Sequence, residues 1–487
     1  MPESRPNILV LMTDQQRLDT ISAYGLNPNC RTPHIDALAM RGVRFNNAFT
    51  PTSICSPARA SLYTGLYPHK HGVTANGLCL RDEVKGINHY LEEAGYACGY
   101  SGKWHVDQKR GPSDFGFVAK DFLGYAFPGS KLLPGLQFAA APLNKPNHYE
   151  VYLKERGLDI PTVSERFVGA NPSNQAQEMF ALHEGPVESC IEYFVAEETI
   201  RVMEQLVGTN RPFFLWANFW GPHTPCLIPE PYFSMYDPDE IPMHPGYYET
   251  FEGKPYVQQL IERLWGLGDY GWEGFQEISA RYYGHCTLID DMVAHIFSAL
   301  EDLGQAENTV VIVTADHGDC MGAHKLIEKG EFMYDETYRI PLIVAHPECQ
   351  NPGSAHDDFL YLHELMCSIL DMAGLEAPPE LDGESFLPAI LGQSVSNDRE
   401  EVYCVFDRHF TVANQRMIRT YTHQLTFNAH DTGELYDMIN DPYQLQNLYH
   451  VPEYNGVRND LMERMEHYMK ELKDPFYGWF RRISGVY

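Results

Sequence analysis

The sequence predicts an α/β protein with a large, mixed but mostly parallel sheet flanked by helices, followed by a smaller antiparallel sheet. Two patterns favour this fold. Short apolar runs recur along the first 350 residues and alternate with helical segments, which is the order typical of layered α/β domains. After about residue 398 the chain changes to short segments of alternating polarity, which is typical of antiparallel strands with one solvated face.

The elements follow from these patterns in order. Residues 8–12 form a continuous apolar run, as expected for a central parallel strand. A helix is expected from Thr32, with Thr32 as its N-cap and Pro33 in its first turn. Further strands are predicted at 43–49, 97–101, 213–219, 309–314, 340–344, 401–406 and within 416–427. Further helices are predicted at 256–267 and 274–303, between 351 and 379, and at 459–473.

Three parts are expected: a catalytic α/β domain over 1–395, an α+β subdomain over 396–473 and an aromatic tail over 474–487. The stretch 111–188 is rich in Gly, Pro and Asn and is expected to form loops around a pocket. The tail contains Phe476, Tyr477, Trp479 and Phe480, which are too apolar to lie free in water. We expect the tail to help form a homo-oligomer, a dimer or tetramer. Packing against its own domain is the alternative.

Charge and cysteine content exclude several classes of protein. The 487 residues include 36 basic and 66 acidic side chains, a net charge of −30, which disfavours nucleic acid and anionic membranes as partners. The 11 cysteines are spread along a long chain, so reduced thiols are expected instead of a disulfide scaffold. Residues 1–6 show no secretory pattern, and no apolar run reaches ~20 residues. A soluble, cytoplasmic protein is therefore expected.

Polar pairs follow two of the predicted strands. Asp14 and Gln15 come directly after the first strand, and Asp316 and His317 follow the strand at 309–314. Ligands of open α/β sheets bind at the carboxyl ends of strands, so the two pairs could converge on one ion. Carboxylate and amide oxygens suit Ca²⁺ or Mg²⁺, while the imidazole leaves Mn²⁺ open. From spacing alone, each Asp could instead cap a following helix or turn.

A second motif begins at Cys55, with the sequence Cys-Ser-Pro-Ala-Arg over 55–59. If Ser56 caps a helix and Pro57 is its first residue, Cys55 lies at the positive end of that helix. Arg59 follows one turn later and can reach back. A cysteine phosphatase needs Arg six residues after the Cys, but that position holds Ser61. A buried structural cysteine is the remaining alternative.

These residues resemble the type I sulfatases of the alkaline phosphatase superfamily. Residues 55–59 with Thr64 and Gly65 match the family signature Cys-x-Pro-x-Arg followed by Thr-Gly, in which the Cys is converted to formylglycine. The likeness covers about residues 5–450 and implies an alkaline phosphatase-like fold. Further family blocks occur in order at Asp14-Gln15, Gly102-Lys103-Trp104-His105, Gly221-Pro222-His223, Asp316-His317-Gly318, Lys329-Gly330 and Glu434-Leu-Tyr-Asp437.

Two departures place the chain within that family. Gln15 and His317 stand where many sulfatases carry Asp and Asn. Both variants resemble the branch that contains choline sulfatases, phosphonate monoester hydrolases and some bacterial sugar or aryl sulfatases. The departures leave the metal and the substrate open.

The resemblance implies a sulfuric ester hydrolase that cleaves a small-molecule or saccharide sulfate monoester to an alcohol and inorganic sulfate. A formylglycine-generating enzyme would convert Cys55, and Arg59 would orient the resulting hydrate. His105 would be the base and His223 the acid. One divalent cation, with Ca²⁺ favoured over Mn²⁺ or Mg²⁺, would be held by Asp14, Gln15, Cys55, Asp316 and His317. Substrate contacts would come from Asn76, Lys103, His223 and Lys329. The alternative is a phosphonate monoester or phosphodiester hydrolase on the same scaffold.

Other polar residues have simpler explanations. Asp290 and Asp291 are expected to be a pair on or behind a helix and not a metal site. His324 and Arg408 could line the pocket. Residues expected to be structural are His69, His71 and Trp104.

Overall fold

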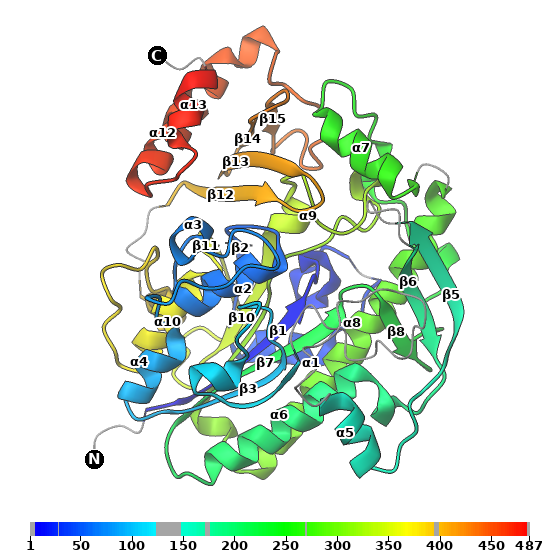
Figure 1. The fold of residues 1–487 in the computed structure, drawn as a ribbon, viewed down its shortest axis with the longest axis vertical. Coiled ribbons are helices and arrows are strands. Elements are labelled where there is room, and N and C mark those ends of the chain that lie inside the picture. The colour runs from blue at the N-terminus through cyan, green and yellow to red at the C-terminus, as the bar shows by residue number, and fades with distance from the viewer. Residues whose placement is uncertain are drawn as a thin grey trace.

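The structure is a computed structural model that describes residues 5–27, 29–122, 148–170, 176–267, 270–393 and 399–484. Its centre is an eight-stranded sheet of order β11-β2-β10-β9-β1-β7-β3-β4, which lies in the lower part of Figure 1. The strands are β1 (Asn7–Asp14), β2 (Val43–Phe49), β3 (Ala97–Lys103), β4 (Val118–Phe122), β7 (Phe213–Pro222), β9 (Thr309–Ala315), β10 (Arg339–Ala345) and β11 (Ser354–Tyr361).

The sheet is parallel except at β10, which runs antiparallel to both β2 and β9. The predicted mixed, mostly parallel sheet is thus confirmed. Strand β1 lies at its centre, between β9 and β7. Next to the end of β1 the register with β7 shifts, because Met12 pairs with Asn218 and Asp14 with Pro222. Such a bulge redirects side chains at a strand end, and here it lies beside the predicted site.

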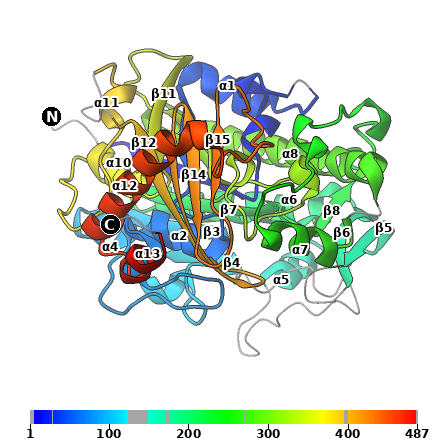
Figure 2. The ribbon, with the colours of Figure 1, turned by 90° about the horizontal axis from the view of Figure 1, so that it is seen from above.

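Helices cover both faces of this sheet (Figures 1 and 2). Alternate residues of β1 enter two separate cores, because successive side chains of a strand point to opposite faces. Leu9 and Leu11 pack with α1, α6 and α8, whereas Ile8, Val10 and Met12 pack with α2, α4 and α10. The helices are α1 (Pro33–Arg41), α2 (Cys55–Thr64), α3 (Pro68–His71), α4 (Ile87–Glu93), α6 (Ile191–Val207), α8 (Gly271–Asp302), α9 (Asp335–Tyr338), α10 (Glu364–Met372) and α11 (Leu387–Ile390).

A four-stranded antiparallel sheet of order β12-β13-β14-β15 follows and lies above the carboxyl ends of the central strands in Figure 1. One face packs on the large domain through Val402, Cys404 and Phe406. The other face, through Tyr403 and Val405, packs beneath the last two helices. The elements are β12 (Glu401–Arg408), β13 (Val412–Thr420), β14 (His423–Asn428), β15 (Glu434–Asp437), α12 (Asn455–Glu471) and α13 (Tyr477–Ile483).

The stretch 111–188 contains more regular structure than its composition indicated. Its described part includes α5 (His148–Glu155), β5 (Val163–Ala170) and β6 (Ala176–His183), and β6 also pairs with β8 (Cys226–Pro229). The expected loops over 123–147 and 171–175 lie outside the described residues. Helix α7 spans Tyr256–Leu264. Strand β11 was not predicted, because its first half is polar and only its second half is buried.

The predicted start of α1 is confirmed, because Thr32 is its N-cap residue and Pro33 lies in its first turn. The Thr32 side chain, however, makes no capping hydrogen bond. Instead, the Asp290 carboxylate accepts from the backbone N–H groups of His34 and Ile35. A partner 256 residues away satisfies the donors that a local cap would have served.

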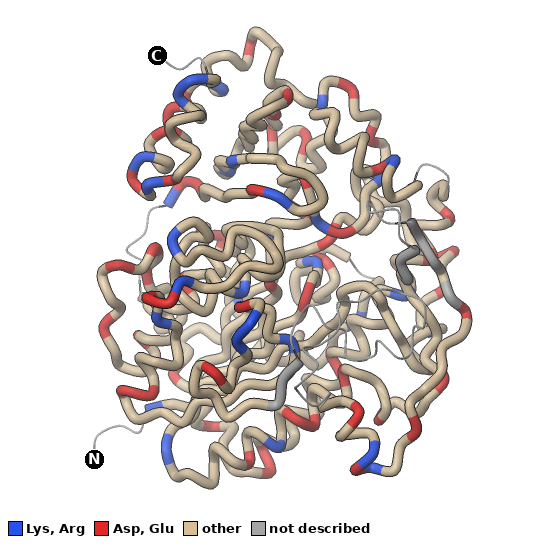
Figure 3. Tube along the Cα trace, in the orientation of Figure 1, with Lys and Arg blue, Asp and Glu red and all other residues tan. Residues whose placement is uncertain are grey.

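Acidic side chains are spread over all parts of the chain and do not gather on one element (Figure 3). Within the described residues, no helix combines the length and the apolar character needed to cross a membrane.

The aromatic tail packs on its own subdomain through part of its length. Phe480 is fully buried, and its ring lies 4.9 Å from that of Phe427. Asp474 accepts two hydrogen bonds from the Arg416 guanidinium. Trp479, in contrast, is 60% exposed. The alternative of intramolecular packing therefore holds for part of the tail, and self-association of the chain stays a prediction.

Replacement of Phe480 by Ala should lower the free energy of unfolding by about 3–5 kcal/mol, because it leaves a cavity under α13. The matched control is Trp479→Ala, which should change it by less than about 0.5 kcal/mol in a monomer. Urea unfolding monitored by circular dichroism measures both. Equal effects of the two substitutions would contradict the observed packing.

Candidate active site

Four side chains that could hold a metal ion meet at the carboxyl edge of the central sheet. Asp14 ends β1, Asp316 and His317 follow β9, and Cys55 begins α2. Because β1 and β9 are adjacent and parallel, their ends share this edge. One ligand atom from each of the four residues lies within 4.8 Å of the others, and all four residues are buried. The strand order thus brings together the two polar pairs, as the sequence indicated.

Helix α2 begins at Cys55 itself, with Ile54 at the N-cap position and no side-chain cap. The predicted cap at Ser56 is therefore wrong. The backbone N–H of Ser56 donates instead to Asn76 Oδ1 at 3.1 Å. Asn76, predicted to contact substrate, thus serves the N-terminus of α2. The Cys55 thiol still lies at the positive end of the helix, where an anion is favoured.

Arg59 joins the elements of the site. Its guanidinium, fully buried, donates to Asp14 Oδ2 and Asp316 Oδ2, both at 2.8 Å. It also donates to Asn218 Oδ1 at 2.9 Å and to the Lys103 carbonyl at 3.1 Å. Burial alone would lower the pKa of Arg59, but Asp316 and Asp14 raise it. A buried cation thus lies between the two carboxylates, at hydrogen-bond distance from each.

Lys103 is 1% exposed, which rules out a surface lysine. Its Nζ lies 2.6 Å from Asp14 Oδ2 and 4.6 Å from the centre of the Trp220 ring. Burial would raise the pKa of Asp14, but Lys103 and Arg59 hold it well below its ordinary value. Asp14 is therefore ionised, which is the form that could bind a cation.

Lys329 approaches the same edge from the loop after β9. Its Nζ donates to Gln15 Oε1 at 2.6 Å, to His223 Nε2 at 2.9 Å and to Glu328 Oε2 at 3.2 Å. An ammonium has only donors, so His223 accepts at Nε2. Its Nδ1 therefore carries the proton that is donated to the Thr224 carbonyl at 2.5 Å. Burial, Lys329 and Lys103 lower the pKa of His223 well below its ordinary value.

His105 and His317 differ in charge although both are buried. Burial and the cations Lys103 and Arg59 lower the pKa of His105, and its Nδ1 has no hydrogen-bond partner among the described residues. For His317, burial would lower the pKa, but Asp316 and Cys55 raise it to about 9. His317 Nδ1 donates to the Gly318 carbonyl at 2.9 Å, while Nε2 lies 3.1 Å from Cys55 Sγ. A neutral His317 would thus present a free Nε2 to a cation.

Three further residues were missed by the sequence analysis. Asp319 accepts from Gln15 Nε2 and could have been suspected from its place two residues after His317. Glu328 pairs with Lys329. His409, just after β12, has a pKa of about 3, because burial and the nearby cations Lys329 and His317 lower it. No motif in the sequence includes His409, because its position near Lys329 and His317 depends on how the small sheet docks.

The residues with simpler explanations also have clear places. His71 accepts from or donates to Ser61, and His69 contacts the Leu472 carbonyl. His324 lies in a buried network with Glu249, stacked on Tyr334, so it does not contact the four residues that could hold a metal ion. Arg408 is exposed. Residues Asp290, Asp291 and His34 lie close enough to hold an ion, but Asp290 caps α1.

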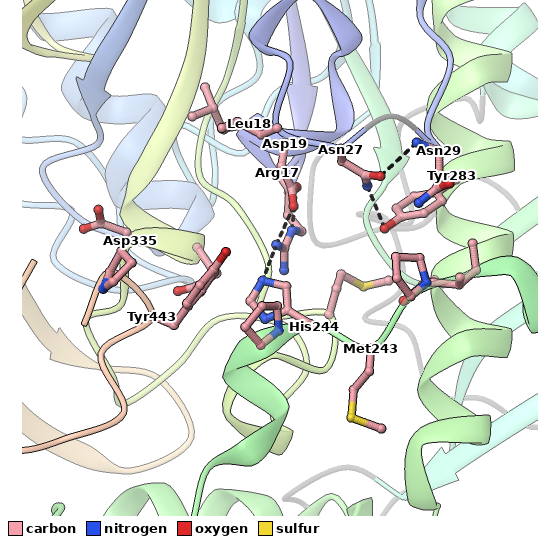
Figure 4. A pocket seen from close by; sticks show the side chains of 18 of the residues that line it. Arg17, Leu18, Asp19, Asn27, Asn29, Met243, His244, Tyr283, Asp335 and Tyr443 are labelled. Atoms are coloured by element: carbon pink, nitrogen blue, oxygen red, sulfur yellow. Dashed lines mark hydrogen bonds and ion pairs between the residues drawn. The ribbon is translucent and has the colours of Figure 1, made fainter. Parts of the chain in front are cut away.

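A separate cavity of about 340 Å³ lies beside the site and is shown in Figure 4. Arg17, Asp19, Met243 and His244 are among the residues that line it, and Arg17 Nη2 lies 3.3 Å from His244 Nε2. None of the predicted site residues lines it. Arg17 connects it to the site, because its NH1 group donates to the Cys320 carbonyl at 2.7 Å. The cavity therefore adjoins the loop that carries Asp316 and His317, and it is separate from the four residues that could hold a metal ion.

A family profile described as Sulfatase matches residues 6–375, and one described as N-sulphoglucosamine sulphohydrolase, C-terminal, matches residues 322–471. The chain belongs to the sulfatase family. This result confirms the resemblance to type I sulfatases of the alkaline phosphatase superfamily and identifies the chain as a sulfatase enzyme.

Similar proteins share nearly the whole length of the chain. An uncharacterised sulfatase of Escherichia coli, YidJ, is 29% identical over 98% of this chain and 90% of its own. An N-acetylglucosamine-6-O-sulfatase of Bacteroides thetaiotaomicron is 24% identical over 96% of this chain and 87% of its own. The crystal structure of a phosphonate monoester hydrolase of Agrobacterium radiobacter superposes with a TM-score of 0.77, covering 96% of each chain at 24% identity. This last likeness shows the fold.

Replacement of Arg59 by Met should lower the free energy of unfolding by about 3–5 kcal/mol, because it leaves two buried carboxylates without their cation. The loss should be smaller in saturating Ca²⁺, which can take over the neutralisation. Urea unfolding with EDTA or with CaCl₂ measures both values, and Arg481→Met, at an exposed arginine, is the control. A loss independent of Ca²⁺ would contradict this account.

Proposed function

We propose that this sulfatase hydrolyses a saccharide or other small-molecule sulfate monoester through a formylglycine at position 55. The observation that carries the proposal is the position of Cys55. It lies at the positive end of α2, beside three cation ligands, and Lys103 and Lys329 contact Asp14 and Gln15 at the same edge. A relative that acts on N-acetylglucosamine 6-O-sulfate supports a saccharide as the alcohol part.

The donor set fits a hard divalent cation. Asp14 and Asp316 provide charged oxygens, Gln15 an amide oxygen and His317 an imidazole nitrogen, a combination that favours Ca²⁺ and leaves Mn²⁺ or Mg²⁺ possible. When bound, the cation would polarise a sulfate oxygen and lower the pKa of the hydroxyl that it contacts. Lys103 and Lys329 would neutralise the remaining sulfate oxygens as point charges.

In the structure residue 55 is a cysteine, and its Sγ marks where an oxygen of the formylglycine hydrate would lie. The hydrate would supply one hydroxyl that attacks sulfur, and a second whose deprotonation breaks the carbon–oxygen bond to sulfate and restores the aldehyde. A plain thiol or hydroxyl has no such release route. A formylglycine-generating enzyme is therefore the expected maturation partner.

His223 would supply the proton that the departing alcohol needs. Its Nε2 lies 2.9 Å from Lys329 Nζ, and in the protonated form of the imidazole this nitrogen would donate to the leaving oxygen. His105 would accept the proton of the second hydroxyl, because the nearby cations lower its pKa and keep it neutral. Acid and base are thus separate histidines.

The test of the function is a paired assay of kcat/KM for an aryl sulfate and an aryl phosphonate with the same leaving group. The enzyme, matured with a formylglycine-generating enzyme, should prefer the sulfate, and peptide mass spectrometry should show the aldehyde at position 55. Cys55→Ala should abolish turnover and leave folding intact. Full activity with an unmodified thiol, or a clear preference for the phosphonate, would overturn the proposal.

His223→Ala should lower kcat by different amounts for substrates with poor and with good leaving groups. For a saccharide sulfate, kcat should fall by about 10²–10⁴-fold, because the alkoxide leaves without a proton. For 4-nitrophenyl sulfate the loss should be much smaller, since nitrophenolate needs no proton. Steady-state kinetics with both substrates on the same preparation provides an internal control. An equal loss for both substrates would show that His223 has another role.

The cellular location and the assembly remain predictions. The chain is proposed to be cytoplasmic and homo-oligomeric, and the second proposal rests on the aromatic tail.

A further inference from the structure

We propose that Asp319 is a positioning residue that decides which atom of the Gln15 amide faces the cation. Gln15 Nε2 donates to Asp319 Oδ2 at 2.5 Å, and Gln15 Oε1 accepts from Lys329 Nζ at 2.6 Å. An ammonium can only donate, so the amide oxygen must face Lys329, and the NH₂ group is left to donate to Asp319. The flipped amide would place a donor against Lys329 and an acceptor against Asp319. Only one orientation of the amide therefore satisfies both neighbours.

The backbone of Gln15 leaves its side chain little other freedom. Its φ is 65°, a conformation that is uncommon for a residue other than glycine. Its N–H donates to Asp316 Oδ1 at 3.0 Å, and its carbonyl accepts from the Tyr282 hydroxyl at 2.5 Å. Hydrogen bonds thus hold both the N–H and the carbonyl of Gln15. The orientation of its terminal amide is left to the side-chain partners, and Asp319 sets it.

Asp319 is itself fixed in place. It is 1% exposed, and its Oδ1 accepts from the backbone N–H groups of Met321 and Glu328 at 2.7 and 2.8 Å. Arg17 holds the same loop from behind through the carbonyls of Asp319 and Cys320. The two carboxylate oxygens thus have different tasks, since Oδ1 closes the loop and Oδ2 orients the amide.

This division explains why the amide at position 15 can serve a cation. An amide offers one oxygen that can bind a cation, and its NH₂ group repels one. Asp319 engages the NH₂ group and leaves Oε1 on the side of Lys329, whose Nζ is 2.6 Å away. The inference rests on the proposed cation site, but it concerns affinity for the ion and not turnover of a substrate.

The decisive variant is Asp319→Asn, which keeps the shape and removes one acceptor. If its oxygen still closes the loop, its NH₂ group faces the NH₂ group of Gln15. The Gln15 amide then either keeps these two donors face to face or turns its NH₂ group toward Lys329 and the cation, and both arrangements weaken the oxygen ligand. The dissociation constant for Ca²⁺ should rise about 10–100-fold, the range for residues that orient a metal ligand.

A double variant separates orientation from loop closure. In Gln15→Glu with Asp319→Asn, one glutamate oxygen accepts from the new amide and the other faces the cation, while the total charge of the pair stays the same. Affinity for Ca²⁺ should return to within about threefold of the wild type. A role of Asp319 in loop closure alone predicts no such recovery.

The experiment is calorimetric titration of EDTA-treated full-length chain with CaCl₂, repeated with MnCl₂, after circular dichroism has shown that each variant is folded. Glu364→Gln is the matched control. Glu364 is also a buried carboxylate whose oxygens accept from two backbone N–H groups, but it begins α10 and does not belong to the loop after β9. That variant should lose stability and keep its Ca²⁺ affinity.

Wild-type affinity in Asp319→Asn would overturn the proposal, and so would a double variant as weak as the single one. If Asp319→Asn does not fold, the double variant is compared with Gln15→Glu, in which two carboxylates face each other. The double variant must then bind Ca²⁺ more tightly, and equal or weaker binding would overturn the proposal. Ca²⁺ binding without turnover would refute the proposed reaction and leave this inference standing, whereas absence of binding to the wild type would refute both.

Discussion

The buried guanidinium of Arg59 is the interaction on which the rest of the site depends. It bonds to Asp14 and Asp316, which end two adjacent strands, and it belongs to the helix that begins at Cys55. Without a cation between them, the two carboxylates would repel each other in a medium of low dielectric constant. The same pairs of charges therefore hold the sheet edge to α2 and, together with Lys103, keep the pKa of Asp14 well below its ordinary value. Stability and catalytic geometry depend on one set of contacts.

The small C-terminal sheet supports this edge through the loop that follows β9. Glu331 accepts from the backbone N–H of Thr411 at 2.5 Å, and Gln424 donates to the Met333 carbonyl at 2.7 Å. A buried network around Lys254 joins the same region to the Gln444 carbonyl. The sheet also places His409 near Lys329. The small sheet thus stabilises the loop that carries Lys329.

Hydrogen bonds to backbone carbonyls give the histidines of the site different roles. His223 and His317 each donate from Nδ1 to a nearby carbonyl, so each presents Nε2 to the site in its neutral form. Their charged neighbours then separate them, since Lys329 lowers the pKa of His223 while Asp316 raises that of His317. Burial and the neighbouring cations Lys103 and Arg59 lower the pKa of His105, so this imidazole is neutral. Local charge, and not burial alone, decides which imidazole carries a proton.

The sequence by itself determined the fold class, the family and the set of residues at the sheet edge. These follow from short-range information: apolar strands, polar pairs at strand ends, and the motif that begins at Cys55. Tertiary structure alone decided which partners complete the site. Asn76 instead of Ser56 serves the start of α2, and Asp319 orients Gln15 across 304 residues of sequence. Such pairings depend on strand order and loop docking, because hydrogen-bond donors and acceptors are matched in space and leave no periodic trace along the chain.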